Sequence, residues 1–293
     1  MTGSEKELDV RISNASRGIK RNFKEYQGKT GGEAKMQVDQ STRVSPFMPM
    51  FEGFRAELDE HHDRRERIIK ATRDITALSK KQQSLFSYAD GSRARSLGEL
   101  EPAILKDVSQ YGEQIKTKFT SIVPDLQGLN AWRYRRNITG AIQEFLEAQS
   151  FGYYIKYERL LDFDAAGDCF PKGILITPED YILGLFDLTG EMMRFAITTL
   201  ATMGALPTFK DSALQSGARN ILSDMQEIRA AFEALDTTAF GAGGMAKDVQ
   251  KKTEVMRTCV EKVENAVYGM KVRGRERQKG WVPSMSDDRM PED

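Results

Sequence analysis

The chain has 293 residues, with 43 basic and 43 acidic side chains, so its formal net charge is zero. This balance excludes a global electrostatic attraction to nucleic acid, and any basic surface has to be local. The length allows a large hydrophobic core in one or two domains. Only two cysteines are present, and because Cys169 and Cys259 lack metal-site spacing, they indicate a reducing intracellular compartment.

The two ends of the chain are polar. Residues 1–45 contain few large apolar side chains and no apolar segment of a secretory signal, so we expect a disordered tail. The basic cluster Lys20, Arg21 and Lys24 fits a weak nuclear-import signal or a nucleic-acid arm, although a solvated tail is the simpler interpretation. We expect a flexible C-terminal tail over 276–293, and a protein of the cytoplasm and nucleus.

Helical periodicity dominates the rest of the chain. Pro124 ends one predicted helix, and Thr177-Pro178-Glu179-Asp180 is a strong helix start, with a Thr cap, Pro in the first turn and acidic residues behind it. We expect a loop over residues 164–173. Residues 173–177 alternate like a strand, but this segment is too short to change the predicted fold class. The predicted helices cover about 51–88, 97–122, 128–160, 178–204, 211–234 and 246–272.

The sequence therefore predicts an all-α fold, a bundle of six or seven long helices in one domain over 46–275. The stretch 181–206 is apolar enough to raise the question of a membrane span. It carries Asp187, Glu191 and Arg194 near its middle, and charged side chains there would be costly in hydrocarbon. We therefore expect a buried core helix.

Four acidic residues lie in two of the apolar helices. Glu144 and Glu147 are spaced i, i+3, and Asp187 and Glu191 are spaced i, i+4, so each pair lies on one helix face. Carboxylates among apolar neighbours are costly to bury unless they are paired or bound to metal. If the two helices pack side by side, the four acids converge. Oxygen ligands without His or Cys favour Mg²⁺ or Mn²⁺ over zinc, and the lack of a Glu-x-x-His motif disfavours iron.

A structural alternative exists for these acids. They could instead form ion pairs with nearby basic residues of the same helices, and on the residues alone both interpretations stay open. The candidate partners are Arg135, Arg136, Lys156 and Arg194.

The first long helix carries a basic face. Such a face can follow a phosphate backbone, or it can be a solvated surface that pairs with neighbouring acids, and the pattern alone favours the second interpretation. Its members are Arg64, Arg65, Arg67, Lys70, Arg73, Lys80 and Lys81.

Four segments of the chain carry a further signal: HHDRRERIIKATRDIT (61–76), ITGAIQEFLEAQSF (138–151), PEDYILGLFDLTGEMMR (178–194) and KVENAVYGMKVRG (262–274). Together they resemble the translin family, and within it the proteins of the translin-associated factor X (Trax) type. The resemblance runs from about residue 47 to 277. The DLTGEMMR and KVENAVYGMKVRG blocks are its most specific parts.

The resemblance implies a translin-like helical fold and assembly with translin into a closed hetero-oligomeric shell, commonly an octamer. The zero net charge and the absence of heptads argue separately against membrane attachment. It also implies that the Trax-type subunit is the catalytic one, a Mg²⁺-dependent endoribonuclease that cleaves short or single-stranded RNA with a metal-activated water. Associated roles are removal of passenger-strand fragments in RNA interference and processing of tRNA precursor fragments.

The resemblance assigns metal binding and catalysis to Glu144, Glu147 and Asp187, with Glu191 one turn further on as a fourth member. As contacts to RNA phosphates we expect basic residues of the first long helix and one beside the second acidic pair, namely Arg64, Arg65, Arg67, Lys70, Arg73 and Arg194. Two other functions stay open: a non-catalytic nucleic-acid-binding scaffold that stabilises translin, and a Mg²⁺-dependent all-α nucleotide pyrophosphohydrolase. The latter enzymes are usually shorter and have no place for the 262–274 block.

Overall fold

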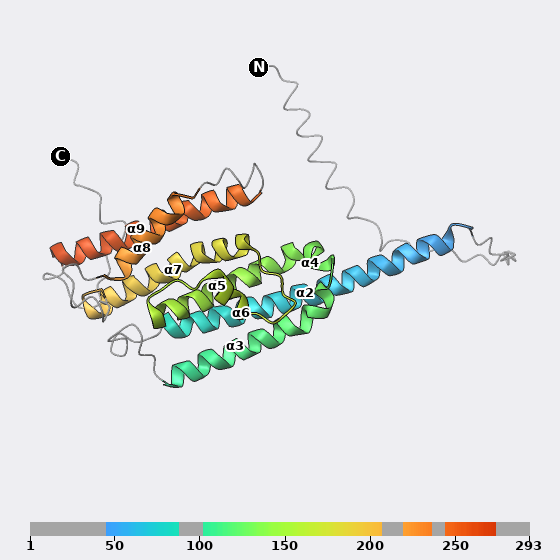
Figure 1. Ribbon diagram of the computed structural model, residues 1–293, viewed down its shortest axis with the longest axis horizontal. Coiled ribbons are helices and arrows are strands. Elements are labelled where there is room, and N and C mark those ends of the chain that lie inside the picture. The colour runs from blue at the N-terminus through green and yellow to red at the C-terminus, as the bar shows by residue number, and fades with distance from the viewer. Residues whose placement is uncertain (1–44, 88–101, 207–218, 236–243, 274–293) are drawn as a thin grey trace, which may run out of the picture. The chain divides into compact units, whose positions relative to one another are not determined.

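A computed structural model describes residues 45–87, 102–206, 219–235 and 244–273. The predicted tails lie outside these residues, apart from Ser45, and so does the basic cluster between Lys20 and Lys24. Every regular element in the described ranges is a helix, which confirms the predicted all-α fold class (Figure 1). The chain divides into two units after Phe51, and the packed helices belong to the second unit, Glu52–Asp293.

Six of the described helices have 13 or more residues, in agreement with the predicted bundle. Three shorter helical segments lie between them along the chain. In order, the elements are α2 (Met48–Ser87), α3 (Pro102–Ile122), η1 (Val123–Leu126), α4 (Asn130–Arg133), α5 (Arg135–Tyr157), α6 (Phe163–Asp168), α7 (Pro178–Met203), α8 (Ile221–Glu233) and α9 (Gly244–Arg273).

Helices α5 and α7 lie side by side, and α7 also packs against α9 (Figure 1). Two groups of buried side chains hold the bundle together. One joins α5 to α7 and α9 through residues such as Phe151, Leu188 and Val260. The other joins α5 to α2 and α3 and includes Ile75 and Phe119. Helix α5 contributes to both groups, so it is fixed in place from both sides.

The start of α7 is as the sequence predicts. The Thr177 hydroxyl accepts a hydrogen bond from Asp180 N, the Asp180 carboxylate receives Thr177 N in return, and Pro178 occupies the first turn. Arg135, at the start of α5, donates to Thr177 Oγ1 and to Glu179 Oε2, both at 2.6 Å. These contacts tie the first turns of α5 and α7 to each other.

Helix α7 is a core helix, as predicted for the apolar stretch 181–206. Half of its 26 residues are buried, and it ends at Gly204, whose φ of 76° suits glycine. In the described part of the chain, no helix has the length and apolarity that a membrane span requires.

The third predicted helix, 128–160, is interrupted. Tyr134 has φ −99° and ψ 7°, so α4 and α5 are separate helices. The Tyr134 ring is buried, and its hydroxyl lies 2.6 Å from His61 Nδ1 on α2. This tertiary packing outweighs the local helical pattern.

Two other predicted boundaries are wrong. The loop predicted at 164–173 contains the short helix α6, because the Asp162 carboxylate caps it by accepting from Ala165 N at 2.8 Å. The sequence pattern predicts a fifth helix from residue 211, but α8 begins at Ile221. Asn220 has an extended backbone there and caps the helix through Leu222 N and Ser223 N. Residues 211–218 lie outside the described ranges.

Candidate functional site

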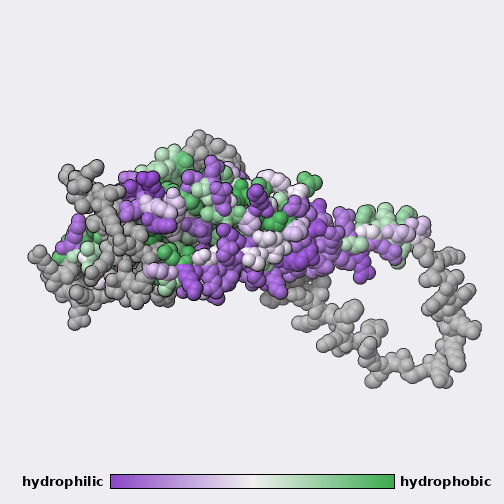
Figure 2. Space-filling view, turned by 60° about the horizontal axis from the view of Figure 1, so that its bottom comes forward, coloured by the Kyte–Doolittle hydropathy of each residue, from purple (hydrophilic) through white to green (hydrophobic). Residues whose placement is uncertain are grey.

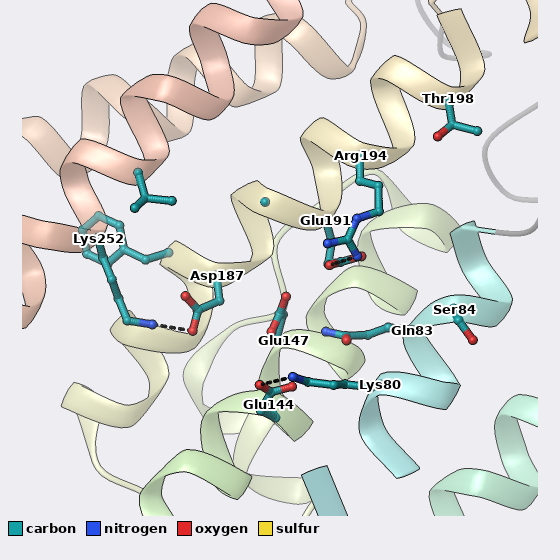
Figure 3. Close-up of a pocket in the computed structure, with 13 residues that line it drawn as sticks. Lys80, Gln83, Ser84, Glu144, Glu147, Asp187, Glu191, Arg194, Thr198 and Lys252 are labelled. Carbon is teal, nitrogen blue, oxygen red and sulfur yellow. Dashed lines mark hydrogen bonds and ion pairs between the residues drawn. The ribbon is translucent and has the colours of Figure 1, made fainter. Parts of the chain in front are cut away.

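The four predicted acidic residues line one pocket of about 830 Å³ (Figure 3). Glu144 and Glu147 enter it from α5, and Asp187 and Glu191 enter it from α7. Helices α2 and α9 complete the wall. The other lining residues are Lys80, Gln83, Ser84, Phe186, Gly190, Arg194, Thr198, Lys252 and Val255.

Close packing of α5 against α7 brings the two acidic pairs together. A Cβ atom on Gly184 would lie 3.1 Å from Leu146 Cβ and 3.5 Å from Gln143 O, so only glycine allows this approach without displacement. On α7, Leu188 and Met192 are fully buried beside the two acids. Burial of these apolar side chains fixes the rotation of α7 and directs Asp187 and Glu191 to the pocket.

Three of the four acids are paired with basic side chains. Lys80 Nζ of α2 lies 3.4 Å from Glu144 Oε1. Lys252 of α9 forms an ion pair with Asp187 and also donates to Leu183 O at 3.3 Å. Arg194 Nη1 donates to Glu191 Oε1 at 2.6 Å. The structural alternative therefore holds for Arg194, whereas Arg135 pairs with Glu179 and Asp180 at the start of α7.

Glu147 lies between the paired acids (Figure 3). Burial is the largest cause, and together with the negative charges of Asp187, Glu191 and Glu144 it raises the pKa of this carboxyl group to about 8. At neutral pH the Glu147 carboxyl group is therefore largely protonated. A divalent cation among these acids would oppose both effects and favour the carboxylate.

The pocket also contains a buried polar atom with unmet hydrogen-bonding capacity. The Glu191 side chain is 7% exposed, and its Oε2 atom has no hydrogen-bond partner among the described residues. Burial raises the pKa of this carboxyl group, and Arg194 opposes the shift. The Gln83 side chain, in the same wall, opposes the rise in the pKa of Glu147. A buried polar atom such as Glu191 Oε2 usually contacts an ion, water or ligand.

The donor set fits a hard divalent cation, because it consists of carboxylate oxygens and includes the unpartnered Glu191 Oε2. With the side chains as they stand, no group of three or more His, Cys, Asp or Glu in the described residues is close enough to enclose a metal ion. Glu144 and Asp187 point toward Lys80 and Lys252 (Figure 3). Metal binding would therefore require these two carboxylates to turn from the lysines toward Glu147.

Of the six predicted RNA contacts, only Arg194 lines the pocket, and its side chain is 63% exposed. Arg64 and Arg67 lie elsewhere on α2 and form ion pairs with Asp125 of η1. Arg64 Nε lies 3.5 Å and Arg67 Nη2 lies 2.7 Å from Asp125 Oδ1. The hydrogen bond from Arg67 lowers the pKa of the Asp125 carboxyl group. These two arginines therefore join α2 to η1.

The other three predicted RNA contacts, Arg65, Lys70 and Arg73, are exposed on α2, away from the pocket lining. The sequence alone does not place Lys80 or Lys252 at the acidic site. Lys80 belongs to the basic face, where nothing local distinguishes it. Lys252 reaches the site only because α9 packs against α7, which the sequence pattern does not encode.

Comparisons with known proteins agree with this fold. Residues 63–274 match the Translin family. Translin-associated protein X of Pongo abelii is 29% identical over 256 residues, covering 79% of this chain and 81% of the relative. Human translin is 21% identical over 238 residues, which cover 79% of this chain and 94% of human translin. The crystal structure of apo-NeC3PO has the same fold, with a TM-score of 0.54 and 16% identity over 76% of this chain and 97% of that one. The chain therefore belongs to the Translin family.

Proposed function

We propose that this chain is the catalytic subunit of a translin-containing assembly and that it cleaves short or single-stranded RNA as a Mg²⁺-dependent endoribonuclease. The observation that carries the proposal is the convergence of four carboxylates from α5 and α7 on one open pocket. Membership of the Translin family supports it. So does the identity to a Trax-type relative, which is higher than that to translin.

Glu144, Glu147 and Asp187 would hold the metal ion, with Glu191 as a fourth ligand. When bound, Mg²⁺ supplies a Lewis acid that activates water and stabilises the charge that develops on the phosphate. Arg194, whose side chain is 63% exposed at the pocket, would orient the phosphate group. Gly190 lines the pocket between the two acids of α7, and a Cβ atom there would meet no atom within 4 Å. Its missing side chain leaves room for the RNA backbone.

Exposed apolar side chains support assembly with a partner. Leu58 on α2, Leu129 before α4 and Trp132 on α4 are 69%, 85% and 60% exposed. Figure 2 shows further hydrophobic side chains along the first turns of α2, where Phe54 is 51% exposed. Large apolar groups on a surface mark protein interfaces. The proposed partner is a translin-type subunit, in a shell such as an octamer.

A second function is favoured by one observation. The ion pairs of Glu144, Asp187 and Glu191 would suit a non-catalytic scaffold subunit in which these acids are structural. The family assignment leaves the nucleotide pyrophosphohydrolase without support.

Cleavage of a labelled single-stranded RNA tests the proposal. The chain would be co-expressed with a translin partner and assayed in Mg²⁺ and in EDTA. We expect Mg²⁺-dependent cleavage that falls by roughly 10³-fold in Glu147→Gln, because a metal ligand is lost. Glu113→Gln, on the exposed face of α3, is the matched control and should cleave like the parent.

Cleavage by Glu147→Gln at the parental rate would refute the assigned site. RNA that is bound but left uncut by the parent, with and without Mg²⁺, would instead support the scaffold function.

A further inference from the structure

Two lysines reach the acidic pocket from helices that carry none of its acids. Lys80 extends from α2 to Glu144, and Lys252 extends from α9 to Asp187, so the two ammonium groups approach from different helices (Figure 3). The Lys252 side chain is 24% exposed and binds two acceptors, whereas the Lys80 side chain is 62% exposed. Lys252 is therefore the more tightly held of the two.

The surroundings of these ion pairs distinguish them from ordinary surface pairs. An isolated exposed pair contributes little, because water screens it. Here both carboxylates share a pocket with Glu147 and Glu191, so each lysine offsets repulsion from several acids. Among the described residues, four acidic and three basic side chains line the pocket. Without a metal ion, Lys80, Lys252 and Arg194 supply the positive charge of this described lining.

We infer that Lys80 and Lys252 are built-in counter-ions that compete with the divalent cation for Glu144 and Asp187. This inference rests on the proposed function, since it concerns the same site. A lysine ammonium group and a metal ion use the same carboxylate oxygens, so binding of the metal displaces the lysines. The lysines thereby hold the acidic side chains together when metal is absent, and they weaken metal binding.

The test is the Mn²⁺ affinity of the full chain in complex with its translin partner, measured by calorimetry without RNA. Heat that disappears in Glu147→Gln defines binding at this site. Lys80→Gln and Lys252→Gln are compared with Lys81→Gln and Lys251→Gln. The two control residues are exposed neighbours on the same helices and lie outside the pocket lining.

We expect Mn²⁺ to bind about five- to tenfold more tightly in Lys252→Gln, and by a smaller factor in Lys80→Gln, because a competing charge is removed. The control variants should bind like the parent. We also expect Lys252→Gln to unfold at a lower temperature than Lys251→Gln in EDTA, with the difference reduced in saturating Mn²⁺.

Normal Mn²⁺ binding by the parent, with unchanged or weaker binding in both pocket variants, would overturn this inference and leave the proposed function intact. An equal increase in Mn²⁺ affinity in the pocket and control variants would also overturn it, since that would be a general effect of net charge. Absence of Glu147-dependent Mn²⁺ binding in the parent would overturn the proposed function and this inference together.

Discussion

Glu147 shows how one residue can lower the stability of a fold for the sake of its site. Its carboxyl group is buried beside three other acids, and these surroundings favour the protonated form. Ionisation of this carboxyl group therefore costs more free energy in the folded, metal-free protein than in the unfolded chain. Buried acids in such a position are typical of functional sites.

The pH dependence of stability follows from the raised pKa of Glu147. The folded protein keeps the proton up to about pH 8, while the unfolded chain releases it near 4.5, so the free energy of unfolding falls as the pH rises between these values. The Glu147→Gln variant has no ionisable group at this position, so its free energy of unfolding does not fall with pH for this reason. We expect its melting temperature in EDTA, relative to the parent, to increase steadily from pH 5 to pH 8, equivalent to roughly 1 kcal/mol or more.

Thermal melts of the parent, Glu147→Gln and the exposed control Glu113→Gln would check this expectation. The control should keep a constant difference from the parent. A constant difference for Glu147→Gln as well would show that the carboxyl group is not protonated in the fold.

At the scale of elements, the site depends on the approach of α5 to α7. Gly184→Leu would place a side chain against Leu146, where a Cβ atom alone is already 3.1 Å away. We expect this change to destabilise the protein by about 1–3 kcal/mol and to weaken Mn²⁺ binding, because α7 must move away from α5. Gly140→Leu on the exposed face of α5 is the control.

A Cβ atom on Gly140 meets nothing within 4 Å, so Gly140→Leu should stabilise the helix slightly, by up to about 1 kcal/mol. Chemical denaturation of both variants gives the free energies of unfolding. Similar values for the two would mean that Gly184 is not needed for close packing.

The local signals of the sequence predict some elements well. The start of α7 needs only Thr177, Pro178 and Asp180, which are neighbours in the chain, and the prediction is confirmed. The break at Tyr134 depends on His61, 73 residues away, so no local pattern reveals it. Boundaries set by tertiary contacts are therefore the ones that sequence reasoning misses.

The same difference between local signals and tertiary contacts applies to the candidate site. Helical spacing places Glu144 with Glu147 and Asp187 with Glu191 on single faces, and the structure brings both pairs to one pocket. Their partners Lys80 and Lys252 come from helices whose packing is not encoded in spacing. The sequence thus predicts the four acids that converge and one opposing charge, Arg194, but not the two lysines.

At the scale of the whole molecule, family membership and the exposed apolar side chains point to a subunit that works in an assembly. The pocket is lined by residues of one chain, from α2, α5, α7 and α9. In the proposed function, this subunit would supply the metal ligands, and a translin partner would add stability and help to enclose RNA.

The most direct test of the central claim is a crystal structure of the assembly soaked with Mn²⁺, with the anomalous signal used to locate the ion. We expect a peak bounded by Glu144, Glu147 and Asp187, with Lys80 and Lys252 turned away from their acids. Lysines still paired with Glu144 and Asp187, and no anomalous peak in the pocket at saturating Mn²⁺, would contradict metal binding at this site.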